Sequence, residues 1–168
     1  DGQTGEVATD IMYDNVMNKF KWGNLGDSTI YLDETNMRMT LNFKNNFSRL
    51  ADALILEKDF VRAEKVLDKC LTVMPNEAIA YSFFNLPIAE GYYKIGKPEK
   101  AREIINILID IYFEELAYYN SLEDDILSKM DRDYQIANQI ISNLYTITTM
   151  NDETELQQKI VEEYQKYQ

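Results

Sequence analysis

Two stretches of this chain repeat the same order of small residues, large apolar residues and turn residues. Ala51 and Ala63 in the first stretch recur as Ala89 and Ala101 in the second, 38 residues later in both cases. In each stretch, apolar residues follow one another at spacings of three and four, which indicates two amphipathic helices. Such a pair cannot bury its apolar faces alone, so neighbouring copies must stack. The pattern therefore predicts an all-α chain built from stacked helical hairpins.

Turn and capping residues stand where this architecture needs them. Glu57-Lys58-Asp59 separates the two helices of the first hairpin, and Gly96 supplies the corresponding turn in the second. Asp59 is placed to cap the helix that follows it. Pro98 fits the first helical turn, where its missing N–H costs nothing. Pro75 is expected to end the first hairpin.

In these positions the sequence resembles the tetratricopeptide repeat (TPR), a family of two-helix solenoids. Residues 44–77 carry its pattern at Phe47, Leu50, Ala51, Leu54, Ala63, Leu67, Cys70 and Pro75. Residues 82–115 carry it at Ile88, Ala89, Tyr92, Gly96, Ala101, Ile105 and Leu108. The alanines are expected at helix crossings, where a larger side chain would push the axes apart. The second copy departs from the pattern at Asn85, which predicts weaker packing of that helix start. It also departs at Phe113, where the helix is expected to continue.

The remainder of the chain predicts a degenerate third unit and terminal helices. The small-residue position recurs at Ala137, and we expect a helix over Asp131–Thr148. Asp152 and Glu155 have the spacing of a capping box for a last helix. Before the repeats, we expect a short helix that ends near Trp22. The predicted organisation is residues 1–40, an N-terminal helix and turn-rich connector packing on the repeats, and residues 41–168, a TPR-like helical domain.

A second resemblance attaches to the segments "MNKFKWGN", "YLDETNMRMTLNFKNNFSRLADALI", "VLDKCLTVMPNE" and "LPIAEGYYKIG". They resemble the C-terminal soluble region of a Bacteroidetes family of multi-spanning membrane proteins. The membrane part of that family is similar to glycosyltransferases of the protein-mannosyltransferase type. The resemblance, together with a start at Asp1, implies a soluble domain of a larger inner-membrane protein, on its periplasmic side. It implies no catalytic residue, because the chemistry would belong to the membrane part.

The net charge and the residue types present argue against several classes of function. The net charge is −12, and residues 110–168 hold 13 acidic and 4 basic side chains, a net of −9. Nucleic acid and anionic membranes are therefore disfavoured as partners. The chain has no histidine, which removes histidine bases, Ser-His-Asp triads and histidine metal sites. No catalytic, cofactor-binding or metal-binding residue is predicted, and no cofactor.

Three features of the sequence suggest chemistry but also have a structural explanation. Cys70, the single cysteine, is expected to be a packed core thiol and not a nucleophile. Glu123-Asp124-Asp125, together with Asp131 and Asp133, could gather a cation such as calcium, but the spacing of a calcium loop is absent and a solvated acidic connection between helices is favoured. The tyrosines invite carbohydrate stacking, but Tyr92, Tyr112 and Tyr118 have helical spacings that favour packing.

The resemblance to TPR proteins implies a peptide-binding groove lined by the first helix of each hairpin. The corresponding residues here are Asn45, Ser48, Asp52, Ile55, Phe83, Leu86, Glu90 and Tyr93. Asp52 and Glu90 would repel a C-terminal carboxylate. The expected partner is a basic or neutral protein or peptide with an apolar anchor for Phe83 and Tyr93. The alternative is that the N-terminal segment or the last helices fill the groove.

These observations give two functional hypotheses. The first is a non-catalytic TPR-like interaction or accessory domain of a membrane glycosyltransferase-like protein. The alternative is a carbohydrate-binding helical-repeat protein of the glycan-uptake type. An enzyme is disfavoured by the residue inventory, and the sequence predicts neither the oligomeric state nor the ligand.

Overall fold

All secondary structure in the described part of the chain is helical. The computed structural model describes residues 5–167, and no strand occurs among them. The all-α prediction is therefore confirmed. None of the helices in this range combines the length and the apolar character needed to cross a bilayer.

The contacts of the chain divide it into two units. The first extends to Ala101 and the second begins at Arg102, so the boundary falls inside helix α5 (Pro98–Asn120). Residues 5–40 lie in the same unit as the first hairpin.

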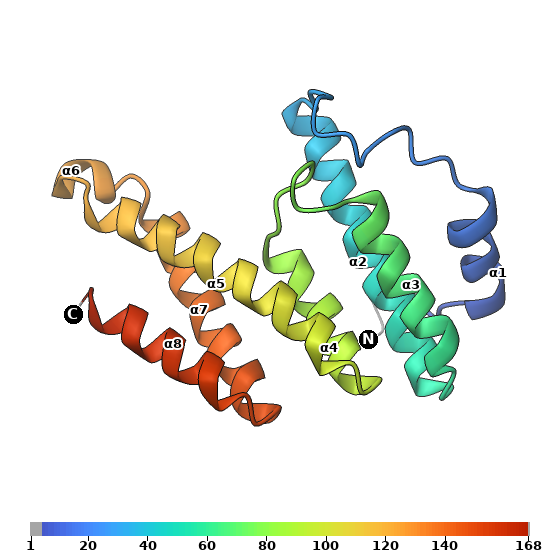
Figure 1. The fold of residues 1–168 in the computed structure, drawn as a ribbon. Helices are drawn as coiled ribbons and strands as arrows, with labels where there is room; N and C mark the ends of the chain where they lie inside the picture. The colour runs from blue at the N-terminus through green and yellow to red at the C-terminus, as the bar shows by residue number, and fades with distance from the viewer. Residues whose placement is uncertain (1–4, 168) are drawn as a thin grey trace. The chain divides into compact units, whose positions relative to one another are not determined.

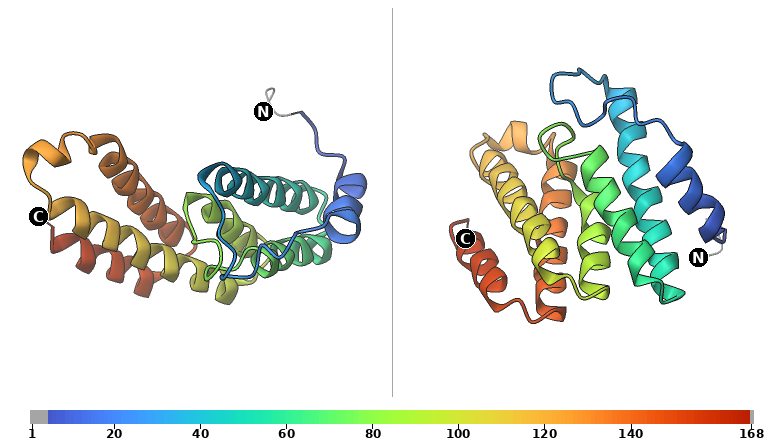
Figure 2. Two further views of the ribbon diagram at one scale, coloured as in Figure 1. Left: turned by 90° about the horizontal axis from the view of Figure 1, so that it is seen from above. Right: turned by 45° about the vertical axis from the view of Figure 1, so that its right-hand side comes forward.

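The first unit is built around the hairpin of α2 (Glu34–Leu56) and α3 (Phe60–Val73), which lie side by side (Figures 1 and 2). Helix α4 (Leu86–Lys94) packs against both of them. A short 3₁₀ turn, η2 (Phe83–Asn85), leads directly into α4. All four alanines that the sequence places at helix crossings are 0–1% exposed. A side chain larger than alanine would have no room at these positions.

The predicted caps and turns are present. Asp33 accepts a hydrogen bond from the backbone N–H of Asn36 (2.8 Å), and Asp59 accepts one from the N–H of Arg62 (3.0 Å). Each satisfies a donor that the first turn of a helix leaves unpaired. Gly96 adopts φ +73°, a left-handed conformation that suits glycine in the turn before α5.

A buried lysine joins α2 to the connection between α3 and α4. Lys44 is completely buried, and its Nζ donates to Asn85 Oδ1 (3.0 Å) and to the carbonyl of Ile79 (3.4 Å). The ammonium also lies 5.0 Å from the centre of the Tyr81 ring. The Oδ1 of Asn85 accepts a second hydrogen bond from the N–H of Ser82 (3.2 Å). Asn85, expected to weaken this helix start, instead supplies the acceptor that makes burial of the lysine tolerable.

The N-terminal helix is shorter than predicted. Helix α1 (Thr9–Asp14) continues as a π-helical turn, η1 (Asn15–Lys19), and the chain is extended from Phe20. Trp22 then packs on α2, with its ring centre 5.7 Å from that of Phe43 and 5.1 Å from that of Phe47. Phe20 contacts Trp22 edge-on but is half exposed. The helical segment therefore ends at Lys19, three residues before the indole that packs on α2.

The second unit contains the rest of α5, the single turn α6 (Asp124–Leu127), α7 (Asp131–Met150) and α8 (Thr154–Gln165). Helix α5 runs through Phe113, and α7 covers the range expected for the third unit's helix. Helix α8 packs against α7. It is also tied to α5, because Lys159 Nζ donates to Asp110 Oδ1 (2.8 Å) and to Asn106 Oδ1 (3.1 Å).

The capping box predicted for α8 is wrong. Asp152 adopts φ +57° in the turn, and Glu153 occupies the N-cap position without a side-chain cap. The Glu153 carboxylate instead accepts a hydrogen bond from Arg102 Nε (2.7 Å), across the unit from α5. A tertiary ion pair has replaced the local cap.

We expect that removing the acceptor of the buried lysine will destabilise the protein. Asn85→Leu leaves the Lys44 ammonium with one hydrogen bond, the 3.4 Å contact to Ile79, beside the ring of Tyr81, so the free energy of unfolding in urea should fall by about 1–3 kcal/mol. The double variant Lys44→Met/Asn85→Leu removes both partners and should regain most of that loss. A single variant as stable as the native chain would contradict the stated role of Lys44.

Stability should also depend on alkaline pH through the same side chain. Burial lowers the pKa of Lys44 from 10.5 to about 8. Between these values the unfolded chain binds more protons than the folded chain, so stability rises with pH. Relative to Lys44→Met, the free energy of unfolding should increase by about 3 kcal/mol from pH 8 to pH 10.5. The comparison with Lys44→Met cancels other alkaline titrations, such as that of Cys70. A constant difference between the two proteins would show that Lys44 titrates normally.

Candidate functional site

The predicted groove residues fall on α2, on η2 and on α4, but they differ in accessibility. Asn45 and Phe83 are exposed, and Phe83 stacks on Phe84 with ring centres 4.1 Å apart. Ser48 and Leu86 are 4% and 8% exposed and present almost no surface. Ser48 donates its hydroxyl to the Asn45 carbonyl (2.9 Å). The remaining four are partly exposed: Asp52, Ile55, Glu90 and Tyr93.

The N-terminal segment lies along part of this face. Arg49 Nη2 donates to the carbonyl of Gly5 (3.4 Å), which brings residues 5–7 beside α2. A cavity of about 750 Å³ remains next to them, lined from α2 and the N-terminal segment. Its lining includes Glu6, Asn45, Arg49, Asp52, Leu56 and Glu57. Among the described residues, 5–7 lie beside α2 and open space remains next to them.

Charge on this face is partly compensated. Asp52 Oδ1 accepts from Lys94 Nζ (2.8 Å), so one of the two predicted carboxylates is neutralised by α4. Within residues 5–167, neither Glu90 nor Glu6 forms an ion pair. The negative charge available to a ligand comes mainly from Glu6 and Glu90.

Arg62 fastens α1 to the turn between α2 and α3. Its Nη1 contacts Asp10 Oδ1 and its Nε contacts Asp59 Oδ2, both at 2.6 Å. The guanidinium also lies over the ring of Tyr13, 5.4 Å from its centre. On the same turn, the Thr9 hydroxyl donates to Glu57 Oε1 (2.9 Å). Two side chains of α1, those of Asp10 and Tyr13, therefore contact the guanidinium of Arg62 on α3.

A second polar cluster lies where α3 meets α4 and the start of α5. The Tyr92 hydroxyl donates to Asp68 Oδ1 (2.7 Å), and Lys100 Nζ contacts both Asp68 (2.6 Å) and Glu64 (3.0 Å). Burial and the bond to Asp68 raise the pKa of Tyr92 well above its usual value. Hydrogen bonds from Lys100 and Lys97 lower the pKa of Glu64. The raised pKa of Tyr92 and the lowered pKa of Glu64 both move away from neutrality, which suits structural interactions and not acid–base catalysis.

Cys70 has the environment of a core thiol. The side chain is completely buried in α3, and burial raises the pKa of Cys70 to about 12. A thiol with this pKa is protonated at neutral pH and is a poor nucleophile.

The structure also bears on the acidic residues and on the tyrosines that the sequence analysis considers. Within residues 5–167, no three acidic or cysteine side chains gather in a way that could hold a metal ion. Tyr92 and Tyr112 are buried in helix packing, as expected. Tyr118 is 54% exposed, so the packing role predicted for it is wrong.

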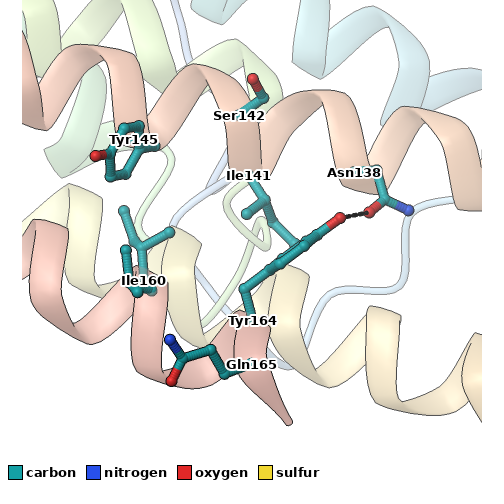
Figure 3. Close-up of a pocket in the computed structure, with 8 residues that line it drawn as sticks. Asn138, Ile141, Ser142, Tyr145, Ile160, Tyr164 and Gln165 are labelled. Carbon is teal, nitrogen blue, oxygen red and sulfur yellow. Dashed lines mark hydrogen bonds between the residues drawn. The ribbon is translucent and has the colours of Figure 1, made fainter. Parts of the chain in front are cut away.

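Sequence analysis did not identify a pocket between α7 and α8 in the second unit. It holds about 380 Å³ and is lined from both helices. In Figure 3, Tyr164 extends from α8 toward α7, where its hydroxyl donates to Asn138 Oδ1 (3.2 Å). Tyr145 and Ser142 lie on α7, and Gln165 lies beside Tyr164 on α8. These residues alternate with the buried stripe of each helix, so the helical pattern marks them only as a solvent-facing side.

Comparisons with models of known families, with curated proteins and with solved structures gave no match in any of the three.

We expect that α1 depends on Arg62 for its attachment. In Arg62→Ala, the backbone amides of α1 should exchange with deuterium faster, while the global free energy of unfolding changes little because exposed ion pairs contribute little to it. Arg38→Ala, which removes an exposed arginine of α2, is the matched control and should leave α1 unchanged. Equal protection of α1 in all three proteins would show that its attachment is apolar.

Proposed function

We propose that the first unit is a non-catalytic, TPR-like interaction domain that binds a basic or neutral peptide along α2 and α4. The observation that carries this proposal is the open hollow beside α2, lined from α2 and residues 5–7, whose volume of about 750 Å³ can take several side chains of a ligand. Its rim offers Glu6, a carboxylate that forms no ion pair within residues 5–167, and Leu56, an apolar side chain that is 85% exposed. A peptide with one basic residue and one apolar anchor matches that pair of features.

Helical packing supports the same proposal. The α2–α3 hairpin with α4 packed on both helices is the arrangement that stacked helical repeats use. In such repeats, the first helices of successive hairpins form the binding face. Here that face carries Glu90 on α4 and the exposed aromatic Phe83 just before it.

We further propose that the chain is an accessory domain of a membrane glycosyltransferase-like protein and lies on the periplasmic side. This part rests on the sequence resemblance, whose segment "MNKFKWGN" covers the end of η1 and Trp22. The indole of Trp22 packs against α2, so the segment that carries the resemblance is joined to the proposed binding unit. The coding sequence upstream of Asp1 tests it. Many membrane-spanning segments there would support the proposal, and a lipoprotein signal would refute it.

Charge reversal tests peptide binding. Glu6→Lys and Glu90→Lys should each weaken binding of basic peptides selected from a display library about two- to fivefold, because each removes one attractive contact at a partly exposed site. Affinities are measured by isothermal calorimetry. Glu103→Lys, an exposed reversal on α5 in the second unit, is the matched control and should bind as the native chain does.

Two results would count against peptide binding. One is a library that yields no peptide above background with the native chain. The other is an equal loss in all three variants, which would reflect net charge alone and not a site on α2 and α4.

A further inference from the structure

The pocket between α7 and α8 lies wholly within the second unit and has the size of a small-molecule site. Its volume of about 380 Å³ falls in the range of roughly 300–1,000 Å³ that such sites occupy. Two regular helices supply every lining residue, and Ile141 and Ile160 at its base are 3% exposed. The base is therefore part of the packed core, which gives the pocket a rigid floor.

No lining residue of this pocket carries a charge. That is unusual in a chain in which 27% of residues are charged, and whose residues 110–168 carry a net of −9. An ionic ligand would find no counter-ion in the lining and would lose its hydration without compensation. The pocket therefore selects neutral molecules.

Aromatic rings and polar groups alternate around the rim. Tyr145 and Tyr164 are 43% and 37% exposed, so each ring keeps a surface open to a ligand. The lining also includes Ser142 on α7 and Gln165 on α8, whose side chains make no hydrogen bond to another residue within 5–167. The rim thus offers apolar faces and hydrogen-bonding groups side by side.

One edge of the pocket is already fixed in position. Asn138 Nδ2 donates to the carbonyl of Tyr134 (2.9 Å), and its Oδ1 accepts from the Tyr164 hydroxyl (3.2 Å). Both ends of this amide are held, and the amide in turn orients the Tyr164 ring (Figure 3). A ligand that stacks on Tyr164 meets a ring that needs little further ordering, which lowers the entropic cost of binding.

From these features we propose that the α7–α8 pocket binds a neutral oligosaccharide. A pyranose ring has an apolar C–H face and a rim of uncharged hydroxyls. The C–H face stacks on Tyr145 or Tyr164, and the hydroxyls bond to Ser142 and Gln165. A purely apolar ligand would leave those polar groups unsatisfied. This site is separate from the peptide face proposed on α2 and α4, so either proposal can fail alone.

Nuclear magnetic resonance of the full chain tests the proposal. Neutral disaccharides of glucose, mannose, galactose and N-acetylglucosamine are titrated to millimolar concentration. At least one should shift the side-chain amide signals of Asn138 and Gln165, and should receive saturation transfer from tyrosine ring protons. Tyr145→Ala and Tyr164→Ala should each weaken its binding about tenfold, since each removes a stacking face.

Tyr118→Ala is the matched control, because Tyr118 is an exposed tyrosine on α5 outside the pocket. Circular dichroism shows whether each variant is folded. If Tyr164→Ala does not fold, Tyr145→Ala still tests the proposal, because it keeps the hydrogen bond between Tyr164 and Asn138. The proposal is overturned if no disaccharide shifts the two amides. It is also overturned if a neutral peptide shifts them and no saccharide does, or if Tyr118→Ala weakens binding as much as the pocket variants.

Discussion

The first unit depends on a completely buried lysine, Lys44, whose ammonium must be hydrogen-bonded within the protein. Lys44 can remain folded inside only because Asn85 Oδ1 and the Ile79 carbonyl accept its hydrogens. An isolated ammonium in an apolar interior would cost several kcal/mol. The connection between α3 and α4 must therefore keep the path that brings both acceptors to α2. In this way one side chain ties the turn before α4 to α2.

The parts of the fold that the sequence predicts well depend on interactions between residues that are close in sequence. Asp59 and Gly96 act within a few residues of their own position, so their spacing alone fixes cap and turn. Interactions between distant residues account for the errors. Lys44 meets Asn85 across 41 positions, and a lysine on an amphipathic helix is ordinarily solvated. Glu153 binds Arg102, 51 positions away, and this pair displaces the cap that the local pattern favours.

Less of the candidate sites than of the fold could be predicted from the sequence. Positions on α2 and α4 can be assigned to a common face from the repeat, but the repeat carries no information about Arg49 binding the Gly5 carbonyl. The α7–α8 pocket was missed for a different reason. Asn138 and Tyr164 occupy the polar side of their helices, where the pattern indicates water. The pocket forms only because α7 and α8 pack against each other. The spacing of apolar residues within one helix does not predict which helix it packs against.

Trp22 is the single tryptophan of the chain, and it rests against the phenylalanine rings of α2. Indole emission responds strongly to the polarity around the ring. The molecule therefore carries a built-in optical label at the point where the N-terminal connector meets the first hairpin. Because the second unit holds no tryptophan, a shift in emission reports on the first unit alone, and the docking of the connector can be followed without attaching a dye.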